Sequence, residues 1–257
     1  MKIGIFDSGI GGTTVLKELQ KLLPDEQYIY YSDSANNPYG NKSHAEIEEL
    51  SLKATEFLLE KGCEIIVIAC NTASAEAAEF LRTRFKDTPI FAIQPALKAV
   101  YDSDYDRGKY TLILATGATL NSSKFKELYQ KYAIPNTVLI DCNGLAELIE
   151  HGKDTKEFLE SKLDKYRGQT ENVVLGCTHY PLVADTIREV LGSNIKFFNG
   201  ARGLARNLAE SIKDKKSPKG EGNVEFYDTG RGYQVRTGDS PLGRYASSQA
   251  DTVDWNN

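Results

Sequence analysis

Four short apolar runs, each ending in small polar residues, recur in the same order in the second part of the chain. The matching segments are residues 5–9 with 113–117, 29–33 with 138–142, 67–72 with 174–178, and 93–96 with 198–201. Their offsets lie between 105 and 109 residues. One such pair would arise by chance, but four collinear pairs favour two related halves.

The apolar runs alternate with amphipathic stretches of helical period, which predicts βα units around parallel sheets. Residues 13–22 place Val15, Leu16, Leu19 and Leu22 on one stripe. We predict an α/β fold of two pseudo-symmetric parallel-sheet α/β domains facing each other across a central cleft. The first α/β domain is expected to comprise residues 1–97 plus 208–257, with a further strand near 224–227, and the second residues 98–207.

Composition and charge narrow the choice of partners. The 257-residue chain has a formal net charge of -5, so we expect no nucleic acid and no membrane surface as partner, but a small molecule. The chain opens without an export signal, and its longest apolar run, residues 65–70, is far shorter than the ~20 residues that span a bilayer. A cytoplasmic location is expected, with the four cysteines as free thiols.

Ligands of open α/β sheets bind outside the carboxyl ends of the strands, so the residues that close the runs are the candidate site. Cys70 lies there, before a helix whose N-cap is expected at Asn71 or Thr72. The free N–H groups and dipole of that helix are expected to lower the pKa of the thiol below ~8.5. A buried structural cysteine is the alternative interpretation.

Cys177 repeats this arrangement in the second half, and Pro181 is suited to open the helix that follows. His179, two residues beyond the thiol, can orient it or assist its proton transfer. A structural histidine is the alternative. The spacing of Cys70, Cys177 and His179 fits no zinc motif, so no metal is expected. If the halves face each other, both thiols line one cleft.

The segment Asp7-Ser8-Gly9-Ile10-Gly11-Gly12 also closes a run and opens a helix. Thr14 stands where a dinucleotide-binding G-x-G-x-x-G needs glycine, and Asp7 would repel phosphate. Asp7 is better suited to pair with an ammonium group or to take up a proton, with Ser8 beside it. Thr116 and Thr119 offer hydroxyls from the other half.

Several other polar positions are expected to be ordinary surface. Residues 33–40 have the composition of a turn-rich loop. Glu150 and His151 are expected at an exposed helix end and His44 on a solvated helix, and neither histidine is assigned a role.

With these residues laid out, the chain resembles the glutamate racemases of the cofactor-independent aspartate/glutamate racemase superfamily. The resemblance extends from residue 3 to about 230. It rests on Phe6-Asp7-Ser8-Gly9-x-Gly11-Gly12, Asp33-x4-Pro38-Tyr39-Gly40, Ala69-Cys70-Asn71-Thr72-Ala73, Thr116-x-Ala118-Thr119, Glu150 and Leu175-Gly176-Cys177-Thr178-His179-Tyr180-Pro181-Leu182. Two separate cysteine signatures, one in each half, make the match specific.

The resemblance implies an isomerase that interconverts L- and D-glutamate without a cofactor and supplies D-glutamate for peptidoglycan. It implies that Cys70 is the base for D-glutamate and Cys177 the base for L-glutamate, each thiol acting on one face of Cα. It further implies that Asp7 assists Cys70 and that His179 with Glu150 assists Cys177. The residues implied to bind substrate are Asp7, Ser8, Tyr39, Gly40, Asn71, Thr72, Thr119, Thr178 and His179.

Three positions depart from the family pattern: Ser32 stands where Gly is common, Asn36 where Arg is frequent, and Asn199 where Asp is usual. These departures concern substrate contacts rather than the reaction. Aspartate racemase is the alternative within the superfamily. A cysteine hydrolase and a non-catalytic amino-acid-binding protein are the alternatives from other classes. Homodimers are common in this family, and the oligomeric state is left open.

Overall fold

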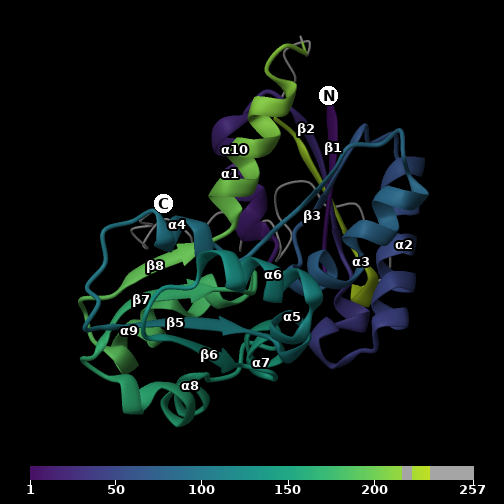
Figure 1. Ribbon diagram of the computed structural model, residues 1–257. Coiled ribbons are helices and arrows are strands. Elements are labelled where there is room, and N and C mark those ends of the chain that lie inside the picture. Colours follow the sequence, from purple (N-terminus) through teal and green to yellow (C-terminus); the bar gives the residue numbers. More distant parts are fainter. Residues whose placement is uncertain (216–221, 232–257) are drawn as a thin grey trace.

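Two parallel sheets, one from each half of the chain, form the framework of the computed structural model, which describes residues 1–215 and 222–231 (Figure 1). The first sheet has the order β4-β3-β1-β2-β9 and the second β6-β5-β7-β8. Read from its other edge, the second sheet is β8-β7-β5-β6. Each pair of predicted runs therefore lies at the same position of its sheet, which confirms the α/β fold and the repeat.

The strands of the first sheet are β1 (Lys2–Asp7), β2 (Gln27–Ser32), β3 (Ile65–Ile68), β4 (Ile90–Ala92) and β9 (Val224–Asp228). The strands of the second are β5 (Tyr110–Ala115), β6 (Thr137–Asp141), β7 (Thr170–Leu175) and β8 (Lys196–Asn199). β9 is the further strand predicted near residues 224–227, and it pairs in parallel with β2.

The α-helices are α1 (Thr13–Leu22), α2 (His44–Glu60), α3 (Asn71–Arg84), α4 (Leu97–Tyr101), α5 (Gly117–Asn121), α6 (Ser123–Tyr132), α7 (Leu145–Glu150), α8 (Lys156–Leu163), α9 (Ala184–Leu191) and α10 (Ala201–Ile212). Short 3-10 helices are η1 (Ser34–Asn36), η2 (Tyr39–Asn41), η3 (Asp164–Tyr166), η4 (Tyr180–Val183) and η5 (Thr229–Arg231). None of the helices in these described ranges is both long and apolar enough to cross a membrane.

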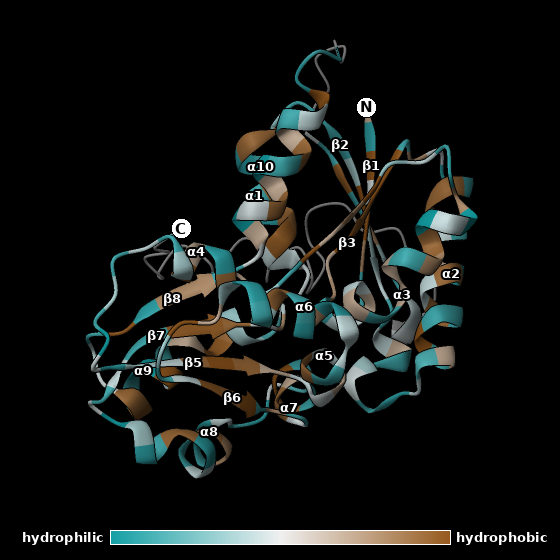
Figure 2. Ribbon diagram, in the orientation of Figure 1, coloured by the Kyte–Doolittle hydropathy of each residue, from teal (hydrophilic) through white to brown (hydrophobic). Residues whose placement is uncertain are grey.

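Helices cover both faces of the first sheet, and the middle parts of its inner strands β1 and β3 are accordingly apolar (Figure 2). α1 and α10 pack on one face with β1, and α2 and α3 pack on the other. Val15, Leu16 and Leu19 form the buried stripe of α1 as predicted. The expectation for Leu22 is wrong: it is 43% exposed because the helix ends at this residue, beyond the edge of the core.

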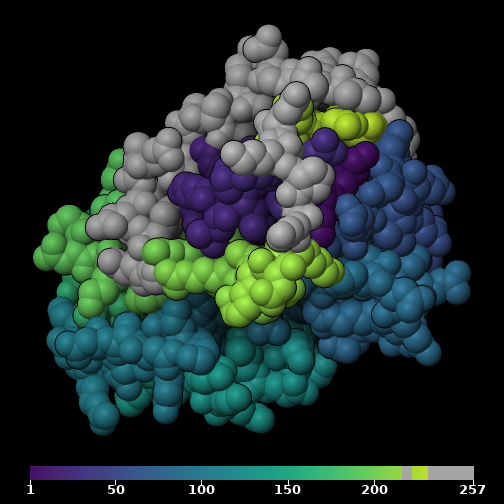
Figure 3. All heavy atoms as spheres, turned by 90° about the horizontal axis from the view of Figure 1, so that it is seen from above, coloured from purple at the N-terminus to yellow at the C-terminus, as the bar shows by residue number. Residues whose placement is uncertain are grey.

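α10 connects the two halves. It follows β8 of the second sheet, yet its apolar side packs against α1 of the first half, and the two helices lie side by side in Figures 1 and 3. The predicted domain boundaries at residues 97 and 207 stay predictions. The crossing helix nevertheless ties the second half to the core of the first.

Candidate active site

Cys70 lies at the junction of β3 and α3, where the sequence places it. It is itself the N-cap residue of α3, so the expected caps Asn71 and Thr72 are the first residues inside the helix. Its Sγ is 3.7 Å from Oγ of Ser8, which follows β1. The carboxyl ends of two neighbouring strands thus bring the thiol and the hydroxyl together.

The predicted lowering of the Cys70 pKa is wrong. Burial raises the pKa of this thiol to about 12, and the carboxylate of Asp7 adds to the increase. The backbone N–H of Ala73, in the first turn of α3, and the hydroxyl of Ser8 act in the opposite direction but are outweighed. Because the residue is only 5% exposed, the cost of desolvating a thiolate exceeds the help from the helix terminus.

Cys177 heads a chain of three polar side chains in the second half. Its Sγ lies 3.8 Å from Nδ1 of His179, and Nε2 of the same ring lies 2.6 Å from Oε2 of Glu150. Burial opposes a charge on His179, but the hydrogen bonds to Cys177 and Glu150 raise its pKa well above the ordinary value. An imidazole held in this way can carry a proton next to the thiol.

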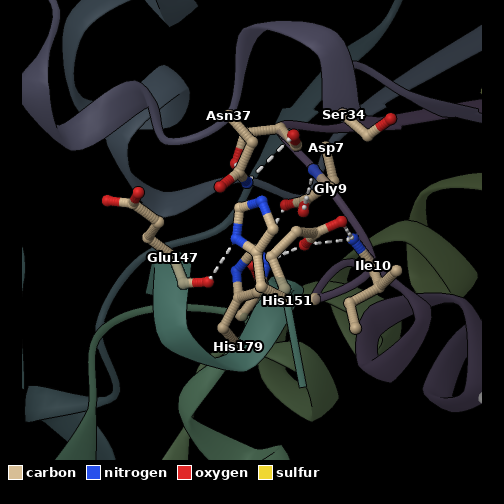
Figure 4. A network of polar contacts seen from close by, with 12 residues as sticks. Asp7, Gly9, Ile10, Ser34, Asn37, Glu147, His151 and His179 are labelled. Carbon is tan, nitrogen blue, oxygen red and sulfur yellow. Dashed lines mark hydrogen bonds and ion pairs between the residues drawn. The ribbon is translucent and has the colours of Figure 1, made fainter. Parts of the chain in front are cut away.

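The two thiol sides are joined across the halves of the chain. Thr178 donates its hydroxyl to Oδ1 of Asp7 at 3.0 Å, and the N–H of Ile10 donates to Oε2 of Glu150 at 3.0 Å. Figure 4 shows Asp7, Gly9 and Ile10 gathered around His179. Charge on Cys177 also contributes to the raised pKa of Cys70, so the two thiols are within electrostatic reach of each other.

Asp7 is fully buried between the two sides. Its other oxygen accepts the N–H of Gly9 at 3.0 Å. Burial raises the pKa of Asp7 above its ordinary value, although His179 and the hydrogen bonds from Gly9 and Thr178 partly oppose the increase. The carboxyl group therefore takes up a proton more readily than an exposed aspartate does.

The glycines of the segment after β1 allow this close approach. A Cβ on Gly9 would lie 2.2 Å from Oε2 of Glu150, and a Cβ on Gly11 would lie 2.6 Å from Nδ1 of His179. Any side chain here would separate the halves. The glycines thus serve contact between two protein surfaces rather than a phosphate.

Composition alone favours an ordinary surface turn for residues 33–40, whereas the resemblance implies that Tyr39 and Gly40 bind substrate. The structure packs this loop against Ser8 and Thr116. The amide of Asn37 donates to the carbonyl oxygen of Ser8 at 3.0 Å. Tyr39 is buried and donates its hydroxyl to Asp33 at 2.7 Å, and a Cβ on Gly40 would lie 3.0 Å from Cγ2 of Thr116. Asn37 contacts the candidate site, which the sequence did not indicate, because turn composition does not report which surface a loop meets.

Hydroxyl and amide groups complete the site between α3 and α5. The hydroxyls of Thr72 and Thr116 lie 3.0 Å apart across the halves, and Thr116 also bonds Thr119 at 3.0 Å. A cavity of about 410 Å³, which Asn71 and Thr119 border, opens beside them. Nδ2 of Asn71 is buried without a hydrogen-bond partner among the described residues, so it can donate to a ligand. Neither thiol borders this cavity.

The two histidines without an assigned role, His151 and His44, bond to residues outside this cluster. His151 bonds the carbonyl oxygen of Glu147 (Figure 4), whereas Glu150, expected beside it at an exposed helix end, reaches the buried His179. His44 is exposed on α2 and bonds Glu76. Across residues 1–215 and 222–231, no three His, Cys, Asp or Glu side chains are grouped to hold a metal ion.

The three departures from the family pattern lie outside the thiol cluster. Asn36 donates to Oδ1 of Asp33 at 2.9 Å. Asn199 accepts the N–H of Ala201 at 2.9 Å where α10 begins. Ser32 is buried at the end of β2, next to Asp7 of β1 in the sheet. Asn36 and Asn199 thus stabilise the local backbone, the first in the loop after β2 and the second at the start of α10.

The His179–Glu150 pair predicts a pH dependence of stability. The folded protein holds the His179 proton more tightly than the unfolded chain, where the pKa is close to its ordinary value of 6.5. The stabilisation is therefore fully present below about pH 6.5 and is lost as the pH rises through the folded pKa, with a limiting slope of about 1.4 kcal/mol per pH unit for one proton. Glu150→Gln, which lacks the charged partner, is expected to flatten this slope.

Urea denaturation of the wild type and of Glu150→Gln between pH 6 and 9 measures the difference. Glu147→Gln removes an exposed carboxylate from the same helix and is the matched control, expected to follow the wild-type profile. Parallel profiles for wild type and Glu150→Gln would contradict the assignment.

Comparison with known proteins gives consistent matches over most of the chain. The family model described as Asp/Glu/Hydantoin racemase matches residues 3–207. A glutamate racemase of Clostridium perfringens is 42% identical over 236 residues, which cover 88% of this chain and 90% of the relative. Glutamate racemase 2 of Bacillus subtilis is 39% identical over 240 residues, covering 90% and 89%.

Solved structures agree with these matches. Escherichia coli glutamate racemase in complex with L-glutamate and activator UDP-MurNAc-ala has a TM-score of 0.77 at 28% identity, covering 95% of this chain and 92% of that chain. The glutamate racemase of Francisella tularensis in complex with D-glutamate has a TM-score of 0.74 at 26% identity, covering 98% and 94%.

Proposed function

Because this chain belongs to the Asp/Glu/hydantoin racemase family, we infer that its two-thiol site interconverts L- and D-glutamate, the reaction named for its relatives. The observation that carries the inference is the pair of buried cysteines, one from each half and each within electrostatic reach of the other, beside the Asp7–Thr178 hydrogen bond that connects the halves. The protein acts as an isomerase, and its product D-glutamate serves peptidoglycan and cell wall synthesis.

Racemisation needs a base on one face of Cα and an acid on the other. In the L to D direction we assign Cys177 as the base: its thiolate takes the α-proton, and the thiol of Cys70 delivers its own proton to the opposite face. The thiol form of one cysteine and the thiolate form of the other exchange in the process, so the balance of protons is kept. In the D to L direction the roles are reversed.

The surroundings of each thiol support this division. The raised pKa of Cys70 keeps it as the thiol at neutral pH, the form that acts as acid in the L to D direction. A protonated His179, held by Glu150, can donate a hydrogen bond from Nδ1 to the sulfur of Cys177. Asp7, buried with a raised pKa, is suited to exchange a proton on the Cys70 side.

The remaining site residues are proposed to bind the substrate ammonium and carboxylate groups. Donors fixed before the reaction stabilise the charge that develops when the α-proton leaves. The unpaired amide of Asn71 and the neighbouring hydroxyls support this assignment. The proposed set is Asp7, Ser8, Tyr39, Gly40, Asn71, Thr72, Thr119, Thr178 and His179.

The cellular setting completes the proposal. We propose a cytoplasmic enzyme whose substrate is a free amino acid and which uses neither cofactor nor metal. A homodimer, common in the family, stays a prediction that sedimentation analysis tests.

Incubation of the purified protein with L-glutamate in D2O tests the function. The expected result is D-glutamate that carries deuterium at Cα, because the delivered proton comes from a thiol that exchanges with solvent. L-Aspartate, one methylene shorter, is the control substrate and is expected to react more slowly. Exchange with aspartate alone would favour the aspartate alternative, and no exchange with either amino acid would overturn the assignment of an enzyme.

A further inference from the structure

The loop of residues 33–40 is held in place from the last described segment of the chain. β9 pairs in parallel with β2, with Asp228 opposite Ser32, and this register brings η5 onto η1. Residues separated by almost two hundred positions thus meet beside the site.

Thr229 makes two hydrogen bonds to this loop through one hydroxyl group. Oγ1 donates to Oδ1 of Asp33 at 2.9 Å and accepts the backbone N–H of Ala35 at 3.0 Å. Both partners lie in the first turn of the loop. The hydroxyl therefore fixes the direction in which the loop leaves β2.

A second set of contacts surrounds the first. Ser34 donates its hydroxyl to Asp228, and the N–H of Gly230 donates to Ser34 at 3.1 Å and to Asp228 at 3.0 Å. A Cβ on Gly230 would lie 2.5 Å from Oγ of Ser34, so the two segments are in close contact.

Asp33 connects Thr229 to the part of the loop that lies near the Cys70 thiol. Its second oxygen accepts the hydroxyl of buried Tyr39, next to Gly40, and the same loop carries Asn37, which bonds Ser8. Ser8 in turn lies 3.7 Å from Cys70. Hydrogen bonds at both ends of the loop, connected along its backbone, thus lead from Thr229 to the Cys70 side of the site.

We propose that Thr229 is a positioning residue of the active site: through Asp33 it holds the loop that places Tyr39, Gly40 and Asn37 against the substrate and the Cys70 thiol. The inference rests on the proposed function for its kinetic consequence. Thr229 is not among the residues proposed to touch a reacting atom, and it acts through Asp33 and the backbone of Ala35.

The test replaces the hydroxyl with a methyl group of nearly the same shape. Thr229→Val is expected to raise the KM for glutamate about tenfold while kcat changes less than about threefold, since the net loss of the two hydrogen bonds of this half-buried hydroxyl is of this order. Thr229→Ser keeps the hydroxyl and is expected to have a KM close to that of the wild type. Thr137→Val, which loses a hydroxyl bond to Ile134 in the second half, is the matched control and is expected to behave as the wild type.

A second measurement does not depend on turnover. The rate at which iodoacetamide alkylates Cys70 in the free protein, followed by peptide mass mapping, is expected to rise about tenfold in Thr229→Val and to stay unchanged in Thr137→Val, since a released loop exposes the thiol. Ser34→Ala removes the contacts of Ser34 with Asp228 and Gly230. It is also expected to raise the KM and the alkylation rate, and it replaces Thr229→Val in the test if that variant does not fold. Wild-type KM and alkylation rate in both loop variants would overturn the proposal. A wild-type protein that does not racemise glutamate would reject the proposed function instead, and the alkylation rates would still decide the role of Thr229.

Discussion

Cys70→Ala and Cys177→Ala are each expected to lower the rate of glutamate racemisation about a thousandfold or more. Each variant removes one of the two groups that transfer the proton, and such groups contribute roughly 10²- to 10⁴-fold. A thousandfold loss corresponds to about 4 kcal/mol of transition-state free energy. The rate of racemisation would be measured by circular dichroism with L- or D-glutamate as the substrate. A concentration of about 1 mM is suitable, because it lies at the upper end of usual KM values.

The enantiomer that still undergoes isotope exchange shows which of the two cysteines acts as its base. In D2O, residual exchange is expected in L-glutamate for Cys70→Ala and in D-glutamate for Cys177→Ala, because each variant keeps one base. Cys63→Ala and Cys142→Ala remove the two other buried thiols and are the matched controls, expected to keep the wild-type rate. A wild-type rate in Cys70→Ala or Cys177→Ala would contradict the assigned roles.

Asp7→Asn is expected to lower kcat about a hundredfold, the lower end of what a proton-transfer group contributes. Asparagine keeps an oxygen that can accept from Thr178 or Gly9 but cannot take up a proton. Burial raises the pKa of Asp7, so its titration falls closer to neutral pH than that of an exposed carboxyl. The pH profile of kcat is therefore expected to lose its acid limb in the variant.

Steady-state kinetics between pH 5 and 9, with thermal unfolding as a check on folding, measure this effect. Asp25→Asn, which changes an exposed carboxylate in the turn before β2, is the control and is expected to keep the wild-type profile. An unchanged kcat in Asp7→Asn would show that the carboxyl takes no part in proton transfer.

The strands and their correspondence could be predicted from the sequence because both depend on local pattern. Apolar runs that end in small polar residues identified β1, β3, β5 and β7, and parallel topology then brought Cys70 and Cys177 to strand ends. The helix after Cys70 was predicted as well. Its exact start was not, since the cap depends on the backbone angles at the junction.

What could not be predicted depends on contact between the halves. Glu150 reaches the N–H of Ile10 across 140 residues, and no periodicity reports such a pairing. The expected lowering of the Cys70 pKa is wrong for the same reason: the helix terminus is a local feature, whereas the depth of burial depends on which surfaces close over the thiol. The glycines at 9 and 11 were visible, but their purpose is clear only from the opposing His179 and Glu150.

The unlike neighbours of the two thiols, Asp7 beside Cys70 and the His179–Glu150 pair beside Cys177, have a consequence for kinetics. Mirror-image amino acids have equal free energies in water, so the equilibrium constant is one and kcat/KM must be identical for both enantiomers. The chemical asymmetry can therefore appear only at saturation, where kcat and KM differ between L- and D-glutamate by one common factor.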